Sequence, residues 1–408
     1  MIVPLVRAAA DTSGGKAGPL GALLRAGLPV PDGFVVPLEA YRRAVVLRGR
    51  APGPSGRSDG VRDRLESRAL SAELLAALGP AVDGLGDVPL AVRSSADDED
   101  TGQTSAAGRY ESVLAVRGVT EVVKALRACW VSLHSSRPIG NRGPGAGSGH
   151  GDPAMAVIVQ RLVDAEIAGV MFTPASEDDD TTIEASWGLG PSVVGGTVTP
   201  DSYRVATDGS IVRTIADKRT RIDRAGDRLR TSAVPTPDRS RPTLDNATTA
   251  RLVQLGRQVA AVLGGPRDVE WAIAGGRIWA LQARPITARP PGSTGAALGT
   301  SAALAGTPGS SGNATGPARI VRGPRDFALV RPGDILVCPF TDPAWTPLLR
   351  IAAGVVTQTG GILSHAAIVA RELRIPAVLG VPDVTEKLRD GVTIAIDGDF
   401  GTVTTVGW

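Results

Sequence analysis

One histidine near the carboxyl end of the chain lies in a sequence suited to accept a phosphoryl group. His365 follows two glycines and a serine, and it opens a helical pattern over about Ser364–Leu373 that Pro376 keeps short. A histidine in the first turn of a helix meets partial positive charge and backbone N–H groups. That field disfavours the imidazolium form and attracts phosphate, so we expect a neutral nucleophile. An isolated histidine more often has only a structural or surface role, as we expect for His134 and His150.

A predicted hairpin carries groups that suit a metal ion and phosphate. The strands are Val269–Ala272 and Arg277–Gln282, joined by a turn that contains two consecutive glycines. Glu270 and Gln282 place oxygen ligands on facing strands, and Mg²⁺ held partly by nucleotide phosphates uses such ligands. Arg284 offers a planar fork to phosphate. A surface hairpin with an ordinary Glu–Arg pair is the competing interpretation.

Two further segments could contact phosphate. The strand Leu90–Arg93 ends in Arg93 followed by Ser94 and Ser95, then by an acidic run that could simply be a solvated loop. A Ser-Gly-Gly-Lys sequence ends at Lys16, but the full Gly-x-x-x-x-Gly-Lys-Ser/Thr pattern of a phosphate-binding loop is absent. Taken alone, the Ser-Gly-Gly-Lys sequence is weak evidence for phosphate binding.

The remaining pattern predicts a mixed α/β protein. The part of the chain before residue 288 mixes helical and strand patterns, and the last hundred residues alternate strand with helix, which suggests a compact α/β domain. The other expected helices are Gly18–Ala26 and Val119–Leu133, and the other expected strands are Gly33–Val36, Met155–Leu162, Arg319–Val321, Ile335–Cys338, Val355–Thr357 and Val392–Ile396.

A segment without charge divides the chain. Pro290–Gly312 consists of 23 residues rich in Gly, Ser, Ala and Pro, without apolar periodicity. Such a composition cannot bury a core and is typical of a flexible linker. We therefore expect a large amino-terminal part and a small carboxyl-terminal part that can move relative to each other.

Composition excludes several classes of function. With 42% hydrophobic and 21% charged residues, the chain fits a soluble globular protein, and we expect no membrane span. The formal net charge of +3 comes without a Lys/Arg run, so no nucleic-acid partner is expected. Cys129 and Cys338 are too few for a disulfide framework and are expected to be buried. The first residues do not form a secretory signal, so we expect a cytoplasmic protein.

The ordered motifs resemble the family of pyruvate phosphate dikinase, phosphoenolpyruvate synthase and rifampin phosphotransferase. The similarity covers nearly all of residues 1–288 and 311–408. The matching sequences are GGKAGPLGALLRAGLPVPDGF (14–34), LAVRSSADDED (90–100), MAVIVQRLVDAEIAGVMFT (155–173), IEASWGLGPSVVGGTVTPDSY (183–203), DVEWAI (268–273), LQARPIT (281–287), TDPAWTPLL (341–349) and TGGILSHAAIVARELRIPAVLG (359–380).

The resemblance implies an ATP-grasp nucleotide-binding domain over 1–288, a flexible linker over 289–312 and a swivelling phosphohistidine domain over 313–408. His365 would be the phosphorylated residue, taking the β-phosphate of ATP with release of AMP and phosphate. Glu270 and Gln282 would hold Mg²⁺. The residues implied to hold ATP are Lys16, Arg93, Gly108, Ser112, Gln160, Glu270, Gln282 and Arg284, with Ser112 standing where relatives often have Thr.

The resemblance does not supply the acceptor, because the family usually carries a third, acceptor-binding domain that we do not find between the two parts or after them. Three hypotheses remain open. A separate partner protein supplies the acceptor site, for pyruvate or another substrate; or the chain is a self-contained kinase of a small biosynthetic metabolite; or it is a non-catalytic, nucleotide-sensing phosphocarrier. The chain has all the polar positions named above, which favours the two catalytic hypotheses.

Overall fold

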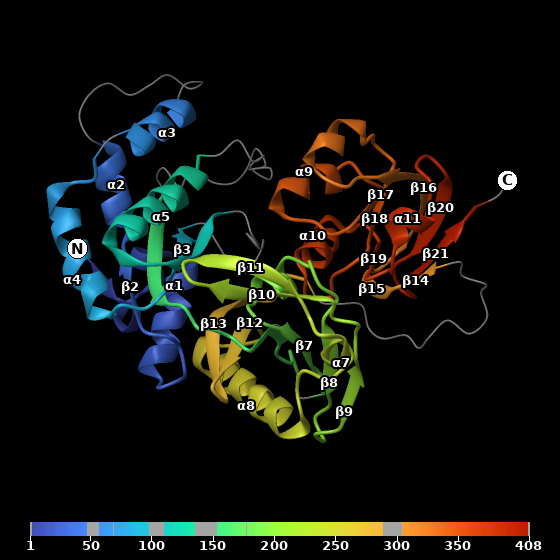
Figure 1. Cartoon of the computed structure of the whole chain (residues 1–408), viewed down its shortest axis with the longest axis horizontal. Helices are drawn as coiled ribbons and strands as arrows, with labels where there is room; N and C mark the ends of the chain where they lie inside the picture. Colours follow the sequence, from blue (N-terminus) through green and yellow to red (C-terminus); the bar gives the residue numbers. More distant parts are fainter. Residues whose placement is uncertain are drawn as a thin grey trace. The chain divides into compact units, whose positions relative to one another are not determined.

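The computed structural model places the described residues in two compact units that are interleaved in the sequence (Figure 1). The described residues are 2–46, 57–67, 69–97, 110–134, 153–176, 178–288 and 304–406. Unit 1 comprises Met1–Asp164, Asp223–Arg230 and Gln254–Pro285; unit 2 comprises Ala165–Ile222, Thr231–Val253 and Ile286–Trp408. These units are not the predicted sequence domains, so the predicted domain boundary at 289–312 stays a prediction.

Unit 1 is built on an antiparallel five-stranded sheet with the order β1-β2-β5-β3-β4. The central strand β5 is buried over six consecutive residues from Met155, which explains its continuous run of apolar side chains. The strands are β1 (Val3–Pro4), β2 (Gly33–Val36), β3 (Leu90–Ala96), β4 (Ser112–Val116) and β5 (Met155–Arg161).

Helices pack against this sheet and supply the rest of its core. Helix α5 contacts β3, β4 and β5 through Val122, Leu126 and Trp130, all fully buried. Helix α1 contacts β3 and β5, and non-helical φ/ψ values at Gly14 interrupt it. The helices are α1 (Ala10–Arg25), α2 (Leu38–Val46), α3 (Arg57–Ser67), α4 (Ala72–Gly84) and α5 (Gly118–Ser132), with the short 3₁₀ helix η1 (Leu5–Arg7) before α1.

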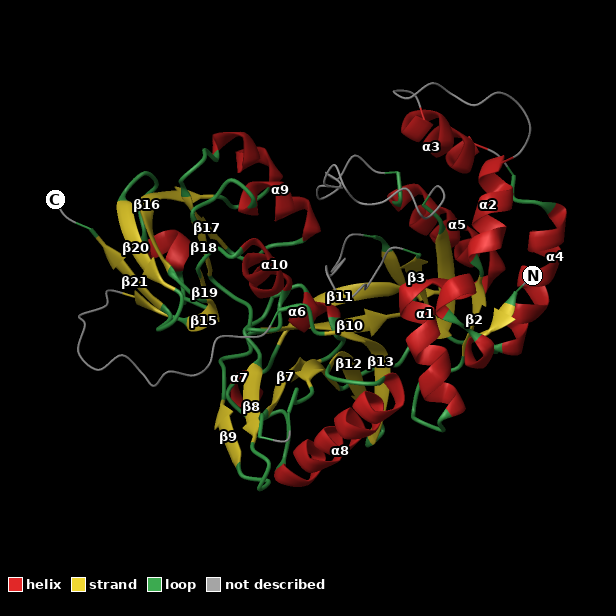
Figure 2. Ribbon diagram, turned by 180° about the vertical axis from the view of Figure 1, so that it is seen from behind, coloured by secondary structure: helices red, strands yellow, loops and turns green. Residues whose placement is uncertain are grey.

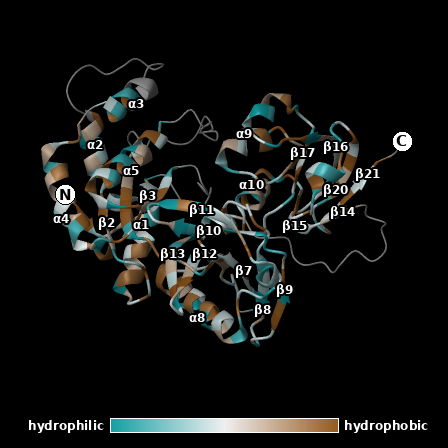
Figure 3. Ribbon diagram, viewed as in Figure 1, coloured by the Kyte–Doolittle hydropathy of each residue, from teal (hydrophilic) through white to brown (hydrophobic). Residues whose placement is uncertain are grey.

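The predicted hairpin is confirmed and also belongs to unit 1. Strands β12 (Arg267–Ala274) and β13 (Arg277–Pro285) pair antiparallel, with Ala274 opposite Arg277. The two turn residues, Gly275 and Gly276, both have positive φ (55° and 72°), as the tight two-residue turn between twisted strands requires. Helix α8 (Asn246–Leu263) precedes the hairpin and carries hydrophobic and hydrophilic residues along its length (Figure 3).

Unit 2 contains an antiparallel meander and a second, larger sheet. The meander runs β6 (Ile167–Phe172), β7 (Thr181–Trp187), β8 (Asp201–Val205) and β9 (Ile211–Thr214). The short helix α6 (Pro191–Val194) contacts β6 and β7. The short helix α7 (Thr236–Arg239) also belongs to unit 2, whereas the strand pair β10 (Thr220–Ala225) and β11 (Arg228–Ala233) has residues in both units.

The carboxyl-terminal part of unit 2 is a mixed eight-stranded sheet with the order β14-β21-β20-β16-β17-β18-β19-β15 (Figure 2). Strands β16 to β19 are parallel, and the outer pairs are antiparallel. Leu336 and Cys338 enter one buried cluster with helix α10, while Ile335 and Val337 enter another on the opposite face. The strands are β14 (Leu304–Ala305), β15 (Thr307–Ser310), β16 (Asn313–Ile320), β17 (Ile335–Cys338), β18 (Gly354–Thr357), β19 (Ala377–Leu379), β20 (Thr393–Asp397) and β21 (Thr402–Thr405).

Short helices connect these strands, and α10 (His365–Leu373) follows β18. It contacts β15, β18, β19 and α9, so its position is fixed by the sheet beneath it. The others are η2 (Pro324–Leu329), η3 (Pro343–Trp345), α9 (Thr346–Leu349) and α11 (Val384–Lys387).

The prediction of a flexible linker is wrong for residues 304–310, because β14 and β15 lie in this segment. The glycines there allow close packing: a Cβ on Gly306 would lie 2.4 Å from the carbonyl oxygen of Leu379, and one on Gly309 would lie 2.7 Å from the Leu379 side chain. Their composition suggested a flexible linker, but Gly306 and Gly309 are small because β19 packs against them. Residues 289–303 of the predicted linker lie outside the described residues.

The other predicted elements agree with the structure, most of them extending a few residues further. The strands at 33–36 and 335–338 have the predicted bounds, and the predicted helix at 364–373 is α10. Cys129 and Cys338 are buried as expected. Across the described ranges, none of the helices has the length and apolar character needed to cross a membrane.

Candidate nucleotide-site and histidine-site residues

His365 is the first residue of α10, as predicted, and its side chain is 4% exposed. Its Nδ1 lies 3.0 Å from the hydroxyl oxygen of Thr341, which is buried beside it in the loop after β17. This hydrogen bond holds one ring nitrogen and fixes the plane of the imidazole. Ser364 occupies the N-cap position, but its hydroxyl donates to the Gly361 carbonyl (2.7 Å). The hydroxyl therefore closes the turn that delivers His365 to the start of the helix.

Unit 1 contains an ion pair between two of the predicted nucleotide-site residues. Arg93 Nη2 lies 2.7 Å from Glu270 Oε2, and Arg93 Nη1 donates to the Leu281 carbonyl at 2.7 Å. Burial by itself would raise the pKa of Glu270, but the charges of Arg93, Arg284 and Lys16 hold it below its usual value. Glu270 is therefore an ionised carboxylate in a positive environment, a combination that suits a site for Mg²⁺ and phosphate.

Gln282 lies directly opposite Glu270 in the hairpin, so the predicted pairing of these two oxygen ligands on facing strands is present. In the part of the chain that the structure describes, no group of three His, Cys, Asp or Glu residues could hold a metal ion by itself. Glu270 and Gln282 would thus need nucleotide oxygens or water to complete a Mg²⁺ site, as is usual for this ion. The donors fit Mg²⁺, and their metal role stays a prediction.

Arg284 is held by an acid that the sequence reasoning missed. Its Nε and Nη2 both lie 2.8 Å from Asp268 Oδ2, and the two side chains are 10% and 5% exposed. Asp268 therefore holds the guanidinium of Arg284 in place. The Asp-x-Glu alternation, which puts both acids on one face of a strand, could have pointed to this residue.

Lys16 is brought to the end of β3 by a close approach of backbones. A Cβ on Gly14 would lie 2.1 Å from the Ser95 carbonyl oxygen, and Gly14 has φ +81°, so glycine is needed on both counts. The Ser95 hydroxyl accepts from the N–H groups of Lys16 (3.2 Å) and Ala17 (3.1 Å), and Lys16 Nζ lies 3.4 Å from the Ser94 hydroxyl. Two segments that were each ambiguous in sequence therefore form one structural feature.

The other predicted residues are less closely associated with this group. Gln160 donates from its amide to the Pro31 carbonyl (2.8 Å) and is 2% exposed, so its side chain supports the turn before β2. Ser112 is exposed and pairs with Arg93 across β3 and β4. Gly108 lies outside the described residues. The nucleotide-binding roles of all these residues stay predictions.

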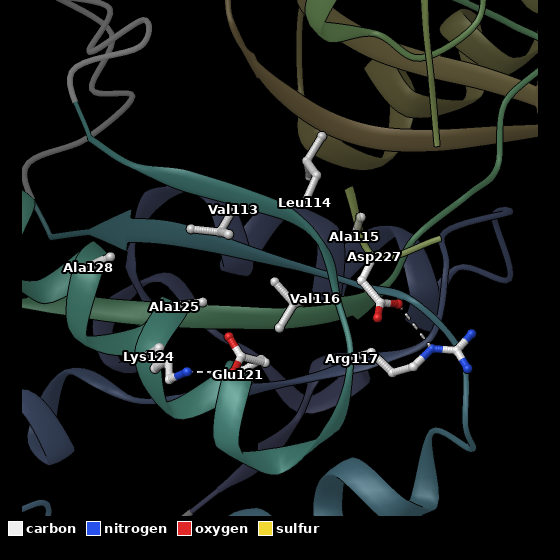
Figure 4. A pocket seen from close by; sticks show the side chains of 10 residues that line it. All are labelled: Val113, Leu114, Ala115, Val116, Arg117, Glu121, Lys124, Ala125, Ala128 and Asp227. Atoms are coloured by element: carbon white, nitrogen blue, oxygen red, sulfur yellow. Dashed lines mark hydrogen bonds and ion pairs between the residues drawn. The ribbon is translucent and has the colours of Figure 1, made fainter. Parts of the chain in front are cut away.

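A surface hollow of about 520 Å³ in unit 1 lies apart from this chemistry (Figure 4). Its floor is formed by apolar residues of β4 and α5, and none of the predicted site residues lines it. The charged residues at its rim are engaged with one another: Lys124 with Glu121 at 2.6 Å, and Arg117 with Asp227 at 3.6 Å. We assign no role in phosphate chemistry to this hollow.

Comparison with known sequences identifies the family. Residues 10–301 match the pyruvate phosphate dikinase AMP/ATP-binding domain, and residues 330–401 match the mobile domain of PEP-utilising enzymes. The chain therefore belongs to the pyruvate phosphate dikinase and phosphoenolpyruvate synthase family. Its fold is an ATP-grasp domain followed by a phosphohistidine domain, as the motifs indicated.

Curated relatives are identical to this chain at about a third of the aligned positions. A probable phosphoenolpyruvate synthase of Methanothermobacter thermautotrophicus is 36% identical over 96% of this chain and 61% of its own length. One from Archaeoglobus fulgidus is 36% identical over 96% of this chain and 56% of its own length. The phosphoenolpyruvate synthase of Aeropyrum pernix is 34% identical, with the same coverage of 96% and 56%. The chain thus spans about three fifths or less of the length of these relatives.

Two functional candidates were not singled out from the sequence. Thr341 lay within a matching motif, but nothing in its neighbourhood pointed to His365 across 24 residues of chain. Glu184 is the charged residue of β7, a strand whose side chains are mostly buried. A lone acid in a buried strand is a usable signal, since buried acids occur almost only with partners.

Proposed function

We propose that this chain is an ATP-dependent phosphotransferase that carries the β-phosphate of ATP on His365 and then passes it to an acceptor. The observation that supports this most directly is the setting of His365: it is the first residue of α10, and Thr341 is hydrogen-bonded to its Nδ1. Such a hydrogen bond orients the imidazole for phosphoryl transfer.

The unit 1 residues would hold the nucleotide. Lys16, Arg93 and Arg284 are cations that can neutralise phosphate oxygens, and Glu270 with Gln282 would hold Mg²⁺. Mg²⁺ bound there would offset further negative charge on the phosphates. Phosphoryl transfer depends mainly on positioning and charge neutralisation, so these residues need no covalent role. The reaction takes up one water and releases AMP and phosphate.

The acceptor is either a small metabolite or a substrate held by a separate protein. The names of the relatives make pyruvate a candidate, with phosphoenolpyruvate as the product. In that form of the proposal, a partner subunit supplies the pyruvate site. A self-contained kinase of a small metabolite, and a non-catalytic nucleotide-sensing phosphocarrier, are the other possibilities.

The amount of AMP released distinguishes these acceptors. The purified chain with Mg²⁺ and ATP should release about one AMP per chain and then stop if the acceptor is missing. Addition of pyruvate alone, or of pyruvate with a partner, should then restart release. Replacement of His365 by Asn should abolish the burst, while the matched His134→Asn variant should retain it. A full burst in His365→Asn would refute the proposal.

A further inference from the structure

Glu184 is a buried acid that the proposed chemistry does not use. It lies in the middle of β7, where its backbone pairs with Val170 of β6 and Ser202 of β8, and it is 2% exposed. Burying a carboxylate is costly unless hydrogen bonds replace the lost water. The partners of Glu184 should therefore reveal why it is there.

Its two oxygens bind two consecutive amides of the loop before His365. Oε1 accepts from the N–H of Ile362 at 2.7 Å, and Oε2 accepts from the N–H of Leu363 at 3.0 Å. Gly361 makes this approach possible, because a Cβ there would lie 2.1 Å from Oε1. The glycine before these amides and the acid on β7 therefore fit each other.

Two further contacts accompany the carboxylate. Leu363 is 1% exposed and packs in a cluster with Val170, Phe172, Val193 and Val198 from β6 and the α6 region. The hydroxyl of Thr359 donates to the Gly196 carbonyl at 2.7 Å. The loop at 359–363 is thus attached to the meander by an apolar side chain, a hydroxyl and two bonds to a carboxylate.

These contacts join the two parts that the family comparison distinguishes. Glu184 lies in the stretch that matches the AMP/ATP-binding domain, whereas Ile362, Leu363 and His365 lie in the stretch that matches the mobile domain. Leu363 is two residues before His365, so anything that holds its amide also places the histidine. The arrangement therefore represents the mobile domain docked on the nucleotide-binding domain.

We propose that Glu184 is the positioning residue that docks the histidine-bearing loop on the nucleotide-binding domain during the loading of His365. The carboxylate binds the Ile362 and Leu363 amides when the mobile domain arrives and releases them when it leaves for the acceptor. This role rests on the proposed function, since it requires that His365 be loaded in one position and unloaded in another.

The balance of interactions at Glu184 fits a reversible contact. Burial raises the pKa of Glu184 to about 7, while the two amide bonds and the charge of Arg371 act in the opposite direction. Arg371 of α10 donates to the carbonyls of Gly309 and Ile362, so it connects the loop to β15. The cost of burying the charged carboxylate thus exceeds the stabilisation from these interactions, so the contact can form and break within a catalytic cycle.

Hydrogen exchange of the loop tests the docking directly, with Glu184→Gln as the variant. The glutamine keeps the size of the side chain, but its NH₂ group faces an N–H donor in place of one acceptor oxygen. Exchange in a peptide covering residues 360–367, measured by mass spectrometry on the full chain, should become about ten- to a hundredfold faster at the Ile362 and Leu363 amides. The matched control, Asp180→Asn, removes a surface partner of Arg204 and should leave this peptide unchanged.

The same two variants separate docking from nucleotide binding. Single-turnover loading of His365 should slow about tenfold or more in Glu184→Gln with unchanged affinity for ATP, and Asp180→Asn should load normally. Unchanged exchange in Glu184→Gln overturns the docking role, and faster exchange with normal loading overturns its part in loading. If wild type forms no phosphohistidine, the proposed function fails, and the exchange result alone still decides whether Glu184 docks the loop.

A coupling experiment strengthens the assignment. The Gly361→Ala variant should speed loop exchange, because its Cβ collides with the carboxylate, and it should do so much less in a Glu184→Ala background. Additive effects of the two substitutions on exchange would contradict a direct contact between these positions.

Discussion

Removing the hydroxyl that holds His365 should slow phosphate loading without affecting nucleotide binding. The Thr341→Val substitution keeps the shape of the side chain and deletes only its oxygen, which lies 3.0 Å from Nδ1. Thr341 and His365 are 1% and 4% exposed, so water does not readily replace the lost bond. A buried polar group that loses its partner costs about 1–3 kcal/mol. If that cost falls on the oriented form of the imidazole, loading slows about 5- to 150-fold.

The assay is single-turnover formation of phosphohistidine, measured by rapid quench at saturating Mg²⁺ and ATP. Thr341→Ser restores the hydroxyl and should recover most of the rate, which a merely structural role of the methyl group would not explain. ATP affinity should be the same in all three proteins, because Thr341 lies outside the nucleotide-site residues. Loading by Thr341→Val at the wild-type rate, or failure of serine to rescue it, would refute the orienting role.

Three further predictions concern other parts of the structure. Glu270→Ala should weaken Mg²⁺-ATP binding about tenfold or more, because it removes the predicted metal ligand and the ionic partner of Arg93. The control Glu121→Ala, at an exposed position, should leave the affinity unchanged. Equal affinities of wild type and Glu270→Ala in isothermal titration would exclude the metal role. Lys218→Met should lower the free energy of unfolding by about 3–5 kcal/mol, since it removes the cation paired with the carboxylate of Asp201, whose Oδ1 lies 2.6 Å from Lys218 Nζ with both side chains fully buried; a loss below about 1 kcal/mol in urea titration would count against this. Because burial raises the pKa of Glu184 from 4.5 to about 7, the folded state binds an extra proton between these two pH values. Its stability relative to Glu184→Gln should therefore be greatest below about pH 4.5 and fall by up to about 3 kcal/mol as the pH rises to 7; parallel stability curves would contradict the buried acid.

Local patterns predicted much of the fold. Short continuous apolar runs located β2, β5 and β17, and the glycine pair located the turn of the hairpin between β12 and β13. The first turn of α10 followed from the serine and glycines before His365. These features depend on short stretches of backbone, which is why sequence patterns identify them.

The features that local patterns did not predict depend on contacts between distant segments. Gly306 and Gly309 seemed flexible because their composition is that of a linker, yet they are small because Leu379 lies against them. Nothing near Thr341 or Glu184 in the sequence identifies their partners, which lie 24 and 178 residues away. Tertiary packing decides the meaning of such residues, and periodicity does not report it.

The central claim is most directly tested by following the β- and γ-phosphates of ATP separately. The purified full chain is incubated with Mg²⁺ and with ATP labelled at either position, and the protein is examined by intact mass, by acid lability and by peptide mapping. The account predicts acid-labile β-label on His365 together with AMP and free γ-phosphate. Label from the γ position with ADP, or stable label on another residue, would contradict it.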